Sequence, residues 1–160
     1  MTPEEIIQII IAIPASLGFA VIFNIRGRKL AAVALGGGLS WVIYVALSYT
    51  GIDVALNYFL VATLISLYAE TMARVLKAPA TIFIAPSLVP LIPGASLYYA
   101  ISHALNGSSE LFAEKALHTL KLAAALAIGI IVSAVIMKAV TKRFLPAKAQ
   151  VKTENSGETK

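Results

Sequence analysis

Few side chains in this 160-residue sequence could do chemistry, and the most unusual group lies in the apolar stretch PSLVPLIPG. This stretch contains Pro86, Pro90, Pro93 and Gly94. Proline lacks an N–H and obstructs the carbonyl four residues earlier. The carbonyls freed in this way are those of Ile82, Pro86 and Val89. Because an unpaired backbone group in lipid costs several kcal/mol, these carbonyls must face protein, water or a ligand.

A second half-helix is expected to begin near Pro93 or Gly94, since proline suits the first position of a helix. The free amides around Ala95 and Ser96 would carry partial positive charge, which suits a substrate carboxylate. Tyr98, one turn further on, could reach into a cavity or simply pack. The alternative to a solute path is a proline kink whose carbonyls are satisfied by neighbouring helices.

Three further polar residues are candidates. Glu70 and Arg74 are four residues apart with the acid first, the favourable order for an ion pair on a helix. The functional hypothesis makes Glu70 a proton or substrate-amine site whose charge Arg74 tunes; the alternative is an interfacial ion pair. Asn24, beside the basic segment RGRK, could cap a helix or bind a solute.

Enzymatic chemistry is not expected. The sequence has no cysteine, no GxxxxGK[ST] phosphate loop, no HExxH motif and no carboxylate-rich cluster. Its serines and histidines follow no catalytic spacing. We therefore expect neither an enzyme nor a bound metal or cofactor, and any transport must draw on a gradient or a partner.

The elements that position these residues are apolar helices. Hydrophobic residues make up 59% of the chain and charged residues 13%, and the mean hydropathy is +0.85. Such a surplus of apolar residues predicts a lipid environment. Five stretches approach the roughly 20 residues that cross a bilayer: residues 6–25, 30–49, 54–75, 79–105 and 120–140. The predicted fold is an all-α bundle of about five transmembrane helices, with the fourth broken near its middle.

The basic residues indicate orientation rather than nucleic-acid binding. Eleven of them fall beside alternate connections or after the fifth stretch, and only Lys115 and Lys121 fall on the other side. The excess of basic residues on the cytoplasmic side predicts an N-terminus outside and a C-terminus inside. Residues 1–146 form one membrane domain, ALNGSSELFAEKAL is expected to be an outer loop, and 147–160 a disordered cytoplasmic tail.

Small residues recur at four-residue spacing along three of the stretches. The sets are Ala12, Ser16, Ala20; Ala32, Gly36, Ser40; and Ala125, Gly129, Ser133. Such faces let helix backbones approach closely in a membrane. We expect them to pack helices, with a pore-lining glycine face as the alternative.

Three segments carry a resemblance to a known family: GFAVIFNIRGRKL, AETMARVLKAPATIF and PSLVPLIPGASLYYA. Over residues 6–140 the chain resembles the threonine/serine exporter family. More narrowly, it is similar to the short stand-alone subunit that corresponds to the C-terminal membrane half of the fused exporters. The arrangement of Pro86, Pro90, Pro93, Gly94 and Tyr98 is specific in combination with the preceding K-x-P of Lys77 and Pro79.

The resemblance implies efflux of small amino or carboxylic acids, of threonine/serine or dicarboxylate type, across the cytoplasmic membrane. It also implies a partner, a longer membrane subunit equivalent to the N-terminal half of the exporter; a homo-oligomer stays open. It assigns no role to Glu70. The competing hypothesis is a non-transporting structural or regulatory membrane partner.

Overall fold

The computed structural model describes residues 2–144, and the predicted tail at 147–160 lies outside the described residues. Every regular element in residues 2–144 is helical. The elements are α1 (Pro3–Ile22), α2 (Arg28–Ser48), α3 (Val54–Val75), α4 (Thr81–Leu88), the short 3₁₀ helix η1 (Val89–Leu91), α5 (Gly94–Leu105) and α6 (Ser109–Phe144).

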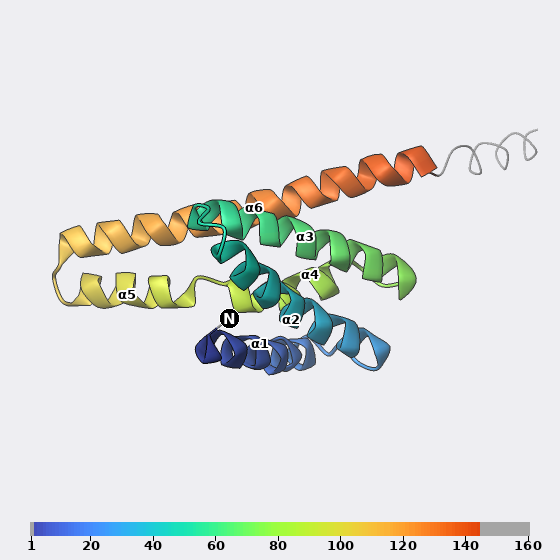
Figure 1. Ribbon diagram of the computed structural model, residues 1–160, viewed down its shortest axis with the longest axis horizontal. Helices are drawn as coiled ribbons and strands as arrows, with labels where there is room; N and C mark the ends of the chain where they lie inside the picture. Colours follow the sequence, from blue (N-terminus) through green and yellow to red (C-terminus); the bar gives the residue numbers. More distant parts are fainter. Residues whose placement is uncertain (1, 145–160) are drawn as a thin grey trace, which may run out of the picture.

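The helices alternate in direction across one bundle (Figure 1). α1 and α2 pack against each other, α3 and α6 lie side by side in the same direction, and α4 fits between α2 and α3. α5 continues away from α4 and pairs in the opposite direction with the first part of α6. This α5–α6 hairpin extends past the ends of α1, α2 and α3.

Among residues 2–144, four helices are long and apolar enough to cross a membrane, namely α1, α2, α3 and α6. The pair formed by Thr81–Leu91 and Gly94–Leu105 passes the same test together and is bent by 60°. Counting this bent pair as one span gives five crossings. The predicted all-α membrane bundle with a broken fourth segment is therefore confirmed.

The fifth helix is longer than the sequence pattern predicted. We expected residues 120–140 after a polar outer loop, whereas α6 begins at Ser109 and has 36 residues. At 1.5 Å per residue its length is about 54 Å. The prediction of a loop is therefore wrong from Ser109 onward. Glu, Lys, Leu and Ala are all good helix formers, so this segment is helical although its charged residues do not favour lipid.

The small-residue faces pack helices, as predicted. Ala12, Ser16 and Ala20 are the buried residues of α1. On α2, Gly36 lies against Ser87 of α4 and Gly37 against Ser16. These contacts hold α1 and α4 close to α2. The described residues therefore assign the glycine face to packing rather than to a pore lining.

Candidate functional site

The helix break, residues 89–93, joins α4 to α5. Ile92 is extended, with φ −62° and ψ 124°, and Pro93 is the N-cap of α5. α5 begins at Gly94, where the sequence predicted the second half-helix to start. The Val89 carbonyl accepts a hydrogen bond from the Ile92 N–H at 3.1 Å, and the Ile92 carbonyl accepts one from the Gly94 N–H at 2.7 Å. The expectation of an open Val89 carbonyl is thus wrong, because the 3₁₀ turn closes onto it.

The first turn of α5 keeps amides that no side chain of the described residues caps. The Leu97 N–H donates to the Pro93 carbonyl at 3.1 Å, and the amides of Ala95 and Ser96 precede this bond. Gly94 does not have a left-handed φ, and a Cβ there would meet no atom within 4 Å. The break therefore depends on the prolines rather than on the conformational freedom of Gly94.

An open cavity of about 210 Å³, with Gln8 and Ile11 exposed at its edge, adjoins the helix break between α1, α2 and η1. Its lining residues are Gln8, Ile11, Ala12, Ala15, Trp41 and Pro90. Ile11 and Ala12 lie near the middle of the 20-residue α1. Pro90 is therefore level with the middle of α1.

Two polar side chains meet at this cavity. The Trp41 Nε1–H donates a hydrogen bond to Gln8 Oε1 at 3.3 Å. The wall formed by α1 also contains Pro14, which cannot donate to the Ile10 carbonyl. Pro14 itself does not line the cavity, and none of the six lining residues is charged.

An aromatic cluster supports Trp41. The Trp41 and Tyr44 ring centroids are 5.0 Å apart, and Tyr44 meets Tyr58 of α3 edge-on at 5.5 Å. The buried Asn57 donates from Nδ2 to the Tyr44 carbonyl at 3.0 Å. Tyr44 therefore packs against the indole and is itself held by Asn57 and Tyr58 of α3.

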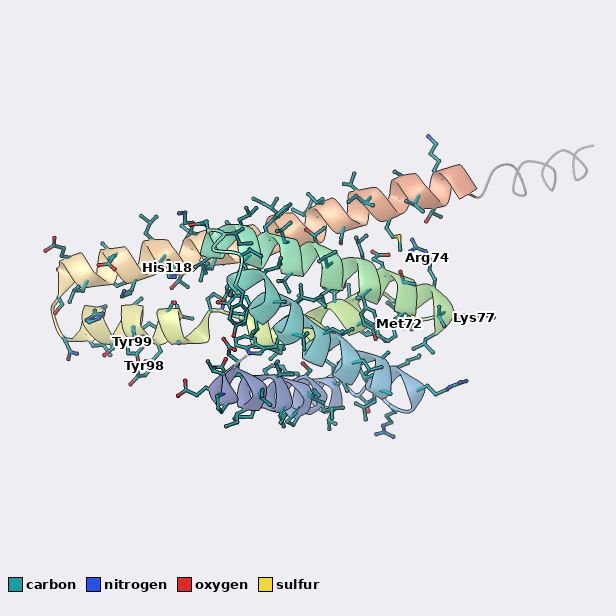
Figure 2. All side chains as sticks on the ribbon, in the orientation of Figure 1. Met72, Arg74, Lys77, Tyr98, Tyr99 and His118 are labelled. Carbon is teal, nitrogen blue, oxygen red and sulfur yellow. The ribbon has the colours of Figure 1, made fainter. Side chains whose placement is uncertain are left out.

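Glu70 and Arg74 lie at a different contact, between α3 and α6. Arg74 Nη2 is 3.7 Å from Glu70 Oε2 and donates to Thr141 Oγ1 at 3.0 Å. Figure 2 shows Arg74 at the side of α3 that faces α6. This pair is therefore linked to α6, and neither residue lines the cavity.

Asn24 and Tyr98 also lie apart from the cavity. Asn24 has φ 56° and follows the C-cap of α1, where the Ile25 N–H donates to the Ala20 carbonyl at 2.9 Å. This is the Schellman pattern that ends many helices. Tyr98 is 68% exposed and lies with Tyr99 on the side of α5 away from α6 (Figure 2).

Of the predicted site residues, Pro90 alone lines the cavity, and the prediction missed Gln8 and Trp41. Pro86 is buried in α4, while Pro93, Gly94 and Ser96 follow at the start of α5. Two signals in the sequence could have found the missed pair. Gln8 is a lone amide in the apolar run IIQIII, and Trp41 is the sole tryptophan of the chain.

Together these features define a multi-pass helical membrane protein with a discontinuous helix, an arrangement common at transporter binding sites. The family model described as "Threonine/Serine exporter, ThrE" matches residues 8–136, which is most of the chain. The chain therefore belongs to the threonine/serine exporter family and is a membrane transport component of that type. No solved structure matches it.

Proposed function

We propose that this chain is one membrane subunit of a secondary exporter for small amino or carboxylic acids, of threonine/serine or dicarboxylate type. The second subunit is a longer membrane protein equivalent to the N-terminal half of the fused exporters. The observation that carries the proposal is the helix break next to an open cavity between α1, α2 and η1. Irregular backbone at this depth is tolerated where it is buried in protein or lines a water-filled cavity.

The exposed faces of the bundle support a membrane partner. Only 17% of the apolar window of α1 is buried, and 22% of that of α6. In a bilayer these faces can contact either lipid or a second subunit. Lipid supplies no hydrophobic drive for helix association, so a second subunit would bind here through close packing.

The charge distribution supports an N-terminus outside and a C-terminus inside the cytoplasmic membrane. The α1–α2 connection, with Arg26 and Arg28, lies at the same end of the bundle as the end of α3, with Arg74 and Lys77. The opposite end has the acids Glu4, Glu5 and Asp53. Basic residues near helix ends remain on the cytoplasmic side.

An efflux assay with matched variants tests the proposal. Cells that express this chain with the longer subunit are loaded with labelled L-threonine, and efflux is compared at equal membrane levels. Pro93→Ala removes the ring and supplies an N–H, so that a regular helical bond from residue 93 to the Val89 carbonyl can replace the 3₁₀ bond from Ile92 and close the break. We expect efflux to fall at least tenfold. The control Gly94→Ala changes the next residue, where a Cβ meets no neighbour, and keeps full efflux.

Two other outcomes would contradict the proposal. If Pro93→Ala assembles with the longer subunit and transports normally, the break has no part in transport. If changes at the break alter only co-purification with that subunit, the chain is the structural or regulatory partner instead. Detergent pull-down beside the efflux assay separates these outcomes.

A further inference from the structure

The hydrogen bond from Trp41 to Gln8 joins α2 to α1 at the cavity beside the helix break. We infer that this cavity binds the transported solute, that Gln8 and Trp41 recognise it, and that it accepts a small net-neutral solute in preference to a dianion. This inference rests on the proposed exporter function and assigns its solute contacts.

Gln8 has hydrogen-bonding capacity left over. A glutamine amide offers two N–H donors and a carbonyl with two lone pairs. The Trp41 indole occupies one acceptor position, and within residues 2–144 the Gln8 Nε2 group makes no hydrogen bond. Both N–H donors are therefore available to a carboxylate or hydroxyl in the cavity, and the carbonyl can still accept from an ammonium group.

The size of the cavity fits a small solute. Its volume is about 210 Å³. A volume of about 10–15 Å³ of this kind is enough for one water, so the open cavity has room for a small solute. Ile11, Ala12, Ala15 and Pro90 supply apolar walls. This combination suits a short aliphatic compound with a few polar groups.

The charge of the lining selects against dianions. None of the six residues carries a charge, and a carboxylate taken out of water needs a cation or several donors to offset its lost hydration. One amide and one indole N–H can serve a single carboxylate. A second carboxylate would lie against Ile11, Ala12 and Ala15 with no donor side chain. A zwitterion avoids this cost because its ammonium group neutralises its own carboxylate.

The packing around Trp41 favours recognition without large rearrangement. Tyr44 lies against the Trp41 ring, and Tyr58 lies edge-on to Tyr44. A side chain held in its binding position before the solute arrives loses less conformational entropy on binding. Trp41 can therefore present its N–H to a solute by exchanging its bond to Gln8.

Fluorescence of the full-length chain in lipid nanodiscs tests the inference. Because Trp41 is the sole tryptophan, all tryptophan emission arises at the cavity. L-threonine and succinate are titrated separately. We expect a saturable change in emission with L-threonine and none with succinate over the same range. Gln8→Leu should weaken the apparent affinity for L-threonine about tenfold, which corresponds to about 1.4 kcal/mol.

Two further variants keep the test decisive. Gln8→Glu preserves shape but places a carboxylate beside that of the solute, so it should also weaken binding. Thr71→Val is the matched control, because the exposed Thr71 hydroxyl donates only to the Leu67 carbonyl of its own helix. Circular dichroism confirms that each variant is folded.

The outcomes separate this site from the exporter function. Absence of any L-threonine response, or wild-type binding by both folded Gln8 variants, overturns the site. An equal response to succinate overturns the preference for neutral solutes. If efflux depends on Pro93 but L-threonine does not change the Trp41 emission, the exporter function stands and this binding site is refuted. If L-threonine changes the Trp41 emission in a Gln8-dependent way but no efflux occurs, the binding site stands and the exporter function is refuted.

Discussion

The backbone of Gly129 in α6 lies directly against the backbone of Phe59 in α3. A Cβ atom at position 129 would stand 2.7 Å from the Phe59 carbonyl oxygen and 2.8 Å from the Ala62 Cβ. A backbone oxygen cannot rotate away as the end of a flexible side chain can. The close approach of the two longest packed helices therefore requires glycine at this position.

Gly129→Ala should lower the free energy of unfolding by about 1–3 kcal/mol, the usual cost of overpacking a close-packed interior. SDS-induced unfolding of the chain in mixed micelles measures this change. The control is Gly18→Ala, where a Cβ would meet nothing within 4 Å. Equal stability of Gly129→Ala and Gly18→Ala would mean that α3 and α6 are further apart in the membrane.

The contact between Gly37 of α2 and Ser16 of α1 predicts a compensating pair. A methyl group on Gly37 would collide with the Ser16 side chain. We expect Gly37→Ala to destabilise the chain by about 1–3 kcal/mol. Adding Ser16→Gly should recover at least half of the loss, as the same SDS unfolding would record. Purely additive effects of the two changes would show that these residues do not touch.

The buried hydroxyl of Ser66 predicts a stabilising substitution. Ser66 Oγ has no hydrogen-bond partner in the described part of the chain, and an unsatisfied buried hydroxyl costs about 1–3 kcal/mol. Ser66→Ala should therefore raise the free energy of unfolding by about 1 kcal/mol. The matched control is Ser133→Ala, since the buried Ser133 hydroxyl already donates to the Ile130 carbonyl at 2.8 Å. A loss of stability in Ser66→Ala would indicate that the Ser66 hydroxyl makes a hydrogen bond in the membrane, for example to a water molecule.

The ion pair of Glu70 with Arg74 favours a structural role over a proton site. Arg74 is 46% exposed and its charged group is 3.7 Å from that of Glu70, and exposed ion pairs contribute about 0–1 kcal/mol. Glu70→Gln should therefore change stability by less than about 1 kcal/mol and leave the pH dependence of efflux unaltered. Efflux measured between pH 5.5 and 8 checks this. Loss of the pH dependence would restore Glu70 as a proton site.

The sequence was most informative where a single helix carries the signal. The bounds of α3 agree with the predicted residues 54–75, because Asp53 caps the helix by accepting from the Ala55 N–H and an apolar run follows. The start of α5 and the three small-residue faces were predictable for the same reason. Each follows from proline, glycine or serine spacing within one segment.

The cavity was not predictable, because it depends on residues from separate segments. Gln8 and Trp41 are 33 positions apart and meet because α1 and α2 pack together, with Gly37 against Ser16. The first third of α6 was missed for a different reason. A search for apolar runs excludes Glu110, Glu114 and Lys115 because they are charged. These residues are nevertheless compatible with a helix, and this part of α6 packs against α5.

Although α6 is long, its uninterrupted apolar section is short. Between Lys121 and Lys138 the helix has only uncharged residues, a section of about 24 Å at 1.5 Å per residue. A bilayer interior is about 30 Å thick. Either the lysine stems must reach outward to the headgroups, or the lipid must thin around this helix. Acyl-chain length is therefore a property of the membrane to which this subunit should be sensitive, independently of any solute or partner.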